Sequence, residues 1–153
     1  MGDPTLKMQI HEQMTAALRA GDKVRLGALR MLAASITNRE KELLHELSDD
    51  EVREVAGREV KKRSESIDAF ESAGRTELAD KERAEREALQ PFAPEQLSAA
   101  EVDALIDDAI ASTGADSMKE MGKVMGVVMA SAKGKVDGSL VQQKVRERLG
   151  SDA

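Results

Sequence analysis

Lysines and arginines spaced along the last third of the chain, with glycines between them, are the residues best suited to chemistry. On an α-helix, Gly122, Gly126 and Ala130 would form one ridge, with Lys119 and Lys123 on its flank. Cationic side chains bind phosphate groups, and glycine lets another backbone approach closely. The pattern predicts a surface for a nucleic-acid backbone, with ten candidate residues: Lys119, Gly122, Lys123, Gly126, Lys133, Gly134, Lys135, Lys144, Arg146 and Arg148.

The charge of the chain changes sign just before this region. Residues 98–116 hold five acidic residues and no basic one, whereas residues 117–149 hold seven basic and three acidic residues. The formal net charge of the 153-residue chain is −6, which argues against non-specific nucleic-acid binding by the whole surface. We therefore expect a local basic patch near the C-terminus of an acidic protein.

Two other interpretations of the glycine ridge stay open. Each glycine inside a helix costs about 1 kcal/mol relative to alanine, so something is expected to approach the backbone there. It could be another helix of the same domain. It could also be a partner helix in a groove, with methionines supplying an adaptable surface. The neighbouring stripe is more typical of a core: Met118, Met121, Met125 and Met129.

The rest of the composition gives little support to catalysis. The chain has no cysteine, and His11 and His45 have no serine or carboxylate partner at a telling spacing. Phe70 and Phe92 are the only aromatic residues, too few for a base-stacking platform. A cluster of Arg58, Lys61, Lys62 and Arg63 is typical of a solvated helix face. We expect no catalytic residue, no metal and no cofactor.

The segments that must position these residues are nearly all helical, so the predicted fold class is all-α. Prolines occur only at positions 4, 91 and 94, and good helix formers dominate. The sequences Ser48–Glu51 and Ser98–Glu101 are capping boxes that each open a helix. We predict helices over about 4–20, 23–44, 49–74, 77–89, 99–113, 117–132 and 140–149, the last after a turn at Asp137 and Gly138.

The prolines divide this series of helices into two parts. The segment 91–94 cannot continue a helix, because proline lacks a donor and disfavours helix in the preceding residue. We predict a four-helix N-terminal domain over 1–93, a proline hinge, and a small three-helix domain over 94–153. The start of the chain does not resemble a secretory signal and no uncharged run is long enough for a membrane span, so a cytoplasmic location without membrane contact is expected.

Several motifs resemble the GatB/YqeY family, in order and over essentially the whole chain. The stretch Arg25–Leu32 is similar to the family's "RLxxLRML" sequence. The segments Lys62–Ile67, Ala73–Arg75 and Pro94–Ser98 follow. The pattern ends with Met118–Met125 and Lys133–Gly138.

The resemblance implies a helical N-terminal part and a small helical C-terminal domain. In the family, that domain is the tail of the B subunit of the tRNA-dependent amidotransferase, which contacts tRNA away from the chemistry. Its motif matches Gly126–Met129, Lys133–Val136 and the last helix, although Gly138 stands where the tail usually has proline. The catalytic body of the B subunit has no counterpart in this chain.

The leading expectation is therefore a non-catalytic accessory module that binds tRNA or a tRNA-handling enzyme. One alternative is a protein–protein interaction module with no RNA contact. A weaker one is a contributor to carbon–nitrogen ligase activity with glutamine as amido donor.

Overall fold

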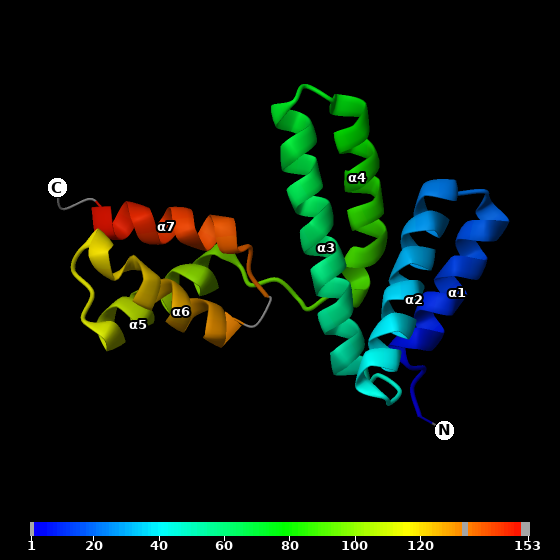
Figure 1. Cartoon of the computed structure of the whole chain (residues 1–153), viewed down its shortest axis with the longest axis horizontal. Helices are drawn as coiled ribbons and strands as arrows, with labels where there is room; N and C mark the ends of the chain where they lie inside the picture. Colours follow the sequence, from blue (N-terminus) through cyan, green and yellow to red (C-terminus); the bar gives the residue numbers. More distant parts are fainter. Residues whose placement is uncertain (1, 133–134, 151–153) are drawn as a thin grey trace. The chain divides into compact units, whose positions relative to one another are not determined.

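The computed structural model describes residues 2–132 and 135–150, and within them the chain is helical without a strand (Figure 1). The predicted all-α class is confirmed. The chain forms two compact units, residues 1–94 and residues 95–153. That a segment starting at residue 94 folds as an independent domain stays a prediction.

The first unit consists of two helical hairpins. Helices α1 and α2 form one hairpin, and α3 and α4 form the other, with α2 packed against both α3 and α4 (Figure 1). A short 3-10 helix, η1, follows α4. The bounds are α1 (Leu6–Ala20), α2 (Lys23–Leu43), α3 (Asp49–Ser72), α4 (Thr76–Leu89) and η1 (Gln90–Phe92).

The sequence specifies the ends of these helices through polar caps and one left-handed turn. Thr5 caps α1 by accepting a hydrogen bond from the Met8 amide, so the helix begins at Leu6, two residues after the predicted start. The Ser48 capping box of α3 is confirmed in both directions. Gly21 adopts φ +72° between α1 and α2, a conformation that glycine reaches without a steric cost.

The apolar sides of the hairpins form a single core in this unit. Leu29, Leu32, Val52 and Leu89 are fully buried in it. As the prolines predict, α4 ends at Leu89, and Phe92 and Ala93 then insert into the same core. A Cβ built at Gly57 would lie 3.1 Å from Pro94 Cδ, so glycine makes room on α3 for this proline.

The second unit is a small bundle of three helices. It comprises α5 (Ala99–Thr113), the 3-10 turn η2 (Met118–Glu120), α6 (Met121–Ala132) and α7 (Gly138–Gly150). The Ser98 capping box is confirmed, and Gly114 ends α5 with φ +69°. The predicted helix over 117–132 is therefore a 3-10 turn followed by an α-helix. The core of the second unit centres on five fully buried residues: Ile106, Val124, Val128, Val141 and Val145.

Candidate nucleic-acid interface

Helix α6 buries one side and exposes the other. Val124, Val128 and Ala132 recur every four residues and are at most 1% exposed. The residues away from this side are exposed, and together with Lys119 of the preceding turn η2 we call them the α6 outer face: Lys119, Gly122, Lys123, Gly126, Val127 and Ala130. The predicted ridge therefore points to solvent.

Nothing in the described part of the unit packs on the two glycines of this face. A Cβ built at Gly122 or Gly126 would meet no heavy atom within 4 Å, apart from chain neighbours and the backbone of the helix itself. The interpretation in which another helix of the same domain packs on the ridge is therefore wrong. The structure leaves the surface open to a ligand or partner.

The methionine stripe lies mainly against the core. Met121, Met125 and Met129 are partly buried and contact the apolar cluster of the unit, as the sequence predicts. Met118 is the exception, with 40% of its surface exposed. Met118 Sδ lies 3.8 Å from a Cβ built at Gly150, at the far end of α7 from Gly138, which Met129 approaches. Helices α6 and α7 are therefore antiparallel.

The α6 outer face contains two lysines and no acidic residue. Helix α6 itself has no Asp or Glu. Glu120, in the turn between Lys119 and Lys123, accepts a hydrogen bond of 3.0 Å from the Asp116 amide. Among the described residues, neither lysine forms an ion pair. Both positive charges are therefore available to an anionic ligand. They lie beside the shallow gap that Gly122 and Gly126 leave on the surface of α6, which we call the notch.

Lys144 and Arg148 are instead engaged with the neighbouring helix. Lys144 Nζ lies 2.9 Å from the Asp103 carboxylate of α5. Arg148 pairs with Asp103 and Asp107, and it also donates to the Asp103 carbonyl oxygen. These contacts clamp α7 to α5, so they give the two candidate cations a structural role. The sequence contains a signal for this pairing. The acids Asp103 and Asp107 are four residues apart, as are the bases Lys144 and Arg148, so each pair lies on one face of its helix.

The remaining candidates do not share one surface. Arg146 is exposed, but two residues from Lys144 on α7 means about 200° of rotation, which places it on another side. Lys135 has an exposed side chain, while its carbonyl oxygen accepts a hydrogen bond of 2.8 Å from the Leu97 amide. Lys133 and Gly134 lie outside the described residues.

The sequence indicates that the basic cluster of α3 is a solvated helix face, but one of its members is buried. Arg63 is only 7% exposed and lies 3.0 Å from Glu85 and 3.6 Å from Glu82, both on α4. Glu59, also buried, accepts a hydrogen bond from Ser35 of α2. Burial and the nearby Glu85 charge raise the pKa of Glu82. Because one arginine joins carboxylates across the hairpin, we interpret this cluster as structural.

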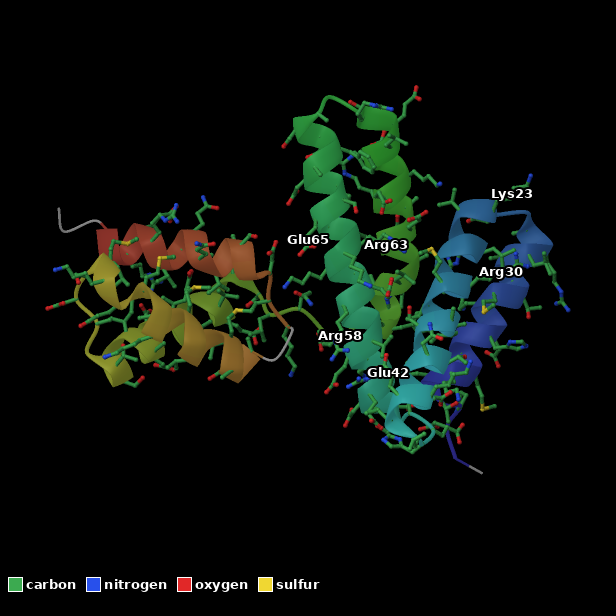
Figure 2. The ribbon with its side chains drawn as sticks, viewed as in Figure 1. Lys23, Arg30, Glu42, Arg58, Arg63 and Glu65 are labelled. Carbon is green, nitrogen blue, oxygen red and sulfur yellow. The ribbon has the colours of Figure 1, made fainter. Side chains whose placement is uncertain are left out.

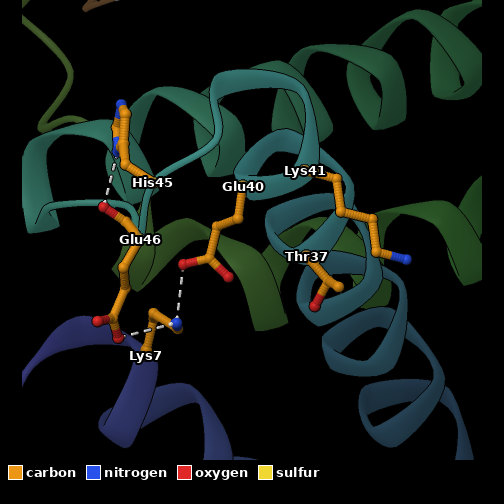
Figure 3. Close-up of a pocket in the computed structure, with 6 residues that line it drawn as sticks. All are labelled: Lys7, Thr37, Glu40, Lys41, His45 and Glu46. Carbon is orange, nitrogen blue, oxygen red and sulfur yellow. Dashed lines mark hydrogen bonds and ion pairs between the residues drawn. The ribbon is translucent and has the colours of Figure 1, made fainter.

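A surface hollow lies where α1 meets the end of α2 (Figure 3). Lys7 donates to Glu40 at 2.9 Å and to Glu46 at 3.2 Å. The hydrogen bond from Lys7 and then that from the Leu47 amide lower the pKa of Glu40, while the bond to Glu40 raises the pKa of Lys7. His45 Nε2 lies 3.5 Å from Glu51, a carboxylate partner that the sequence did not suggest. The carboxylates of this hollow, Glu40 and Glu46, are therefore both paired with Lys7, whereas Lys41 forms no ion pair among the described residues.

Metal-binding groups and membrane-spanning helices are both absent from the described part of the chain. No group of three or more His, Asp or Glu side chains there is arranged to hold a metal ion. No helix there is long and apolar enough to cross a membrane.

Comparison with known proteins links the chain to one family. The model of the YqeY-like protein family matches residues 7–149. The chain is 30% identical to "Altered inheritance of mitochondria protein 41, mitochondrial" of Pyrenophora tritici-repentis, over 94% of this chain and 80% of that protein. It is 27% identical to an uncharacterized protein of Schizosaccharomyces pombe, over 62% of this chain and 77% of that one.

The open surroundings of the glycines predict the effect of replacing them. Gly126→Ala should raise the free energy of unfolding by about 0.5–1 kcal/mol, because alanine is the better helix former and meets no neighbour, and Gly122→Ala, in the first turn of α6, should raise it by less. Gly27→Ala in α2, equally open, should act alike. Gly114→Ala, at positive φ, should destabilise. Urea unfolding followed by circular dichroism measures these changes, and destabilisation by alanine at Gly126 would show that the ridge is packed.

The Lys7–Glu40 pair predicts a pH-dependent contribution to stability. The pKa of Glu40 is lowered in the folded state. Its contribution to the free energy of unfolding is therefore present above pH 4.5, the usual pKa of a glutamate, and is lost as the pH falls through the folded-state pKa. The raised pKa of Lys7 keeps its contribution up to its usual value of 10.5 and beyond. Lys7→Met should lower stability near neutral pH by at most about 1 kcal/mol, because the pair is partly exposed.

The measurement is thermal unfolding of Lys7→Met across a pH series. The deficit relative to the unmodified protein should shrink as the solution becomes more acidic than the folded-state pKa of Glu40. Lys41→Met is the matched control, because Lys41 lines the same hollow without an ion pair among the described residues. A deficit that is the same at every pH contradicts the account.

Proposed function

Because the chain belongs to the YqeY-like protein family, we propose that it is a non-catalytic tRNA-binding module whose α6 outer face contacts the phosphate backbone. The resemblance of its second unit to the tail of the amidotransferase B subunit supports tRNA as the ligand. No catalytic step in amide transfer is assigned to this chain.

One observation carries the proposal: two exposed glycines of α6, Gly122 in the first turn and Gly126 in the middle, have nothing packed on them. Each lowers the stability of a helix of only 12 residues, and the interior of the unit gains nothing from them. A large, rigid ligand surface that approaches the helix backbone gives them a purpose, because any side chain there would hold it away. A nucleic-acid backbone is such a surface.

The charges around the notch fit a polyanion. Lys119 and Lys123 lie one helical turn apart beside Gly122 and Gly126, and no acidic residue is present within α6. Lysine contacts to phosphate position a nucleic acid without reading its sequence. Lys135 and Arg146 are additional exposed cations of this unit, whereas Lys144 and Arg148 serve to hold α7 on α5.

Recognition would depend on the shape of the RNA. Phe92 is buried in the first unit and Phe70 is partly buried, so neither offers an open ring for stacking. Without stacking, a protein recognises folded RNA through its backbone and its hydroxyl groups. A compact tRNA presents such a surface.

A cytoplasmic location stays a prediction for this chain. The name of the Pyrenophora relative places that protein in mitochondria, which makes the mitochondrion the alternative compartment. The proposed RNA contact does not depend on the choice between them.

The proposal is tested by titrating fluorescently labelled tRNA with the full chain between 50 and 200 mM salt. The affinity should fall as salt rises, because binding releases counterions from the RNA. The variant Lys119→Gln with Lys123→Gln should weaken binding and reduce the slope of log affinity against log salt by about 2. Gly126→Leu should weaken binding without changing that slope, because it adds bulk and no charge.

The matched control removes the same number of positive charges from the first unit. Lys61→Gln with Lys81→Gln alters two exposed lysines of the first unit and should leave the affinity nearly unchanged. Absence of tRNA binding by the unmodified chain overturns the proposal. So does binding that the α6 variants leave unaltered, and a protein partner captured after nuclease treatment would then indicate the protein-interaction alternative.

A further inference from the structure

A second exposed, positively charged helix face is present in the first unit, on α2. Lys23, Arg30 and Lys41 all lie on the outward side of this 21-residue helix, with small or uncharged residues between them (Figure 2 labels Lys23 and Arg30). We call this set the α2 outer face: Lys23, Gly27, Arg30, Ala34, Thr37, Asn38 and Lys41. Every member is exposed.

The packing of α2 determines which residues point outward. Leu26, Leu29, Leu32 and Ile36 are buried, and the helix contacts α1, α3 and α4. At about 100° per residue, positions 23, 27, 30, 34 and 41 fall within a sector about 60° wide. This sector is opposite the buried side. The three cations therefore align along the helix instead of winding around it.

The face is free of uncompensated negative charge. None of its members is acidic, and Glu42 at its edge is ion-paired with Arg39 at 2.9 Å. At the far end, the carboxylates of Glu40 and Glu46 are both bound to Lys7.

Within the described part of the chain, the cations of the α2 outer face are unpaired, whereas several other basic residues of the unit form ion pairs. Among the described residues, Lys23, Arg30 and Lys41 form no ion pair. Arg63 and Arg83, by contrast, pair with carboxylates of their own hairpin.

The length of the row favours an extended polyanion over a single acidic group. Lys23 and Lys41 are 18 residues apart, about 27 Å at 1.5 Å per residue. An isolated phosphate or carboxylate would contact one of these cations, whereas a nucleic-acid backbone carries a charge every few ångströms and can meet all three. Gly27 and Ala34 have no side chain or a short one, so the backbone of α2 is accessible between the long side chains.

We propose that the α2 outer face is a second binding surface for the RNA backbone, separate from the one on α6. This inference rests on the proposed RNA-binding function and assigns part of the affinity to the first unit. Two modest contacts in one chain reinforce each other, because the first raises the effective concentration of the second. An RNA long enough to reach both surfaces would then bind more tightly than either unit alone allows.

The experiment compares three full-length variants in the tRNA titration. The first is Lys23→Gln, Arg30→Gln and Lys41→Gln, which removes the cations of the α2 outer face and keeps long, helix-compatible side chains. The second is Lys119→Gln with Lys123→Gln. The control is Lys61→Gln, Arg75→Gln and Lys81→Gln, which makes the same change in net charge on the α3–α4 hairpin of the same unit. Thermal unfolding shows that each variant is folded.

The α2 variant should weaken binding by about tenfold or more at 150 mM salt, and its log–log salt slope should fall by about 2 to 3. The control should remain within about twofold of the unmodified chain. An α2 variant that binds like the control overturns this inference, and if the α6 variant is then still weakened, the proposed function stands. If the α2 variant alone is weakened, the α6 site fails and this inference stands. If the unmodified chain binds no tRNA, both fail.

Discussion

Burial of Val124, Val128 and Ala132 is the interaction on which the functional account depends. Three short helices must form a core from small aliphatic side chains, since no aromatic residue is present in the second unit. The only continuous apolar side of α6 therefore packs against α5 and α7, and this leaves the opposite side, with Gly122, Gly126 and their lysines, in solvent. The exposed notch follows from the way the core is filled.

The structure uses its basic residues in two different ways. Some join helices, as Lys144 and Arg148 join α7 to α5 and as Arg63 joins α3 to α4. The buried Arg63 pair loses part of its Coulomb energy to desolvation, and the partly exposed pairs between α5 and α7 each add little to stability. Others lie on exposed helix faces away from carboxylates. This division, more than the net charge, distinguishes a surface that can bind a polyanion from one that cannot.

Most of the fold could be predicted from the sequence because local signals determine it. The capping boxes at Ser48 and Ser98 and the positive φ of Gly21 and Gly114 need only a few neighbouring residues. The outward direction of the α6 glycines was one of three open interpretations, because periodicity shows which residues share a face but not what packs on it.

The sequence shows only by the four-residue spacing of Asp103 and Asp107 and of Lys144 and Arg148 that these charges could pair, and it does not show which helices meet. Asp103 and Lys144 are 41 residues apart, so their contact depends on how α5 and α7 pack. The burial of Arg63 likewise depends on the partner helix α4. The α2 outer face cannot be recognised from the sequence for a different reason. Its bases are separated by 7 and 11 residues and form no cluster along the chain; they align only on a helix whose buried side is known.

The central claim is that the backbone of α6 at its glycines meets RNA, and a residue-level observation tests it most directly. In a two-dimensional NMR spectrum of the ¹⁵N-labelled full chain, the amide signals of Gly122, Lys123 and Gly126 should shift or broaden as unlabelled tRNA is added. The signals of Ile106 and Val145, inside the same unit, should change little. Saturable binding that leaves the three α6 amides unaltered would contradict the account.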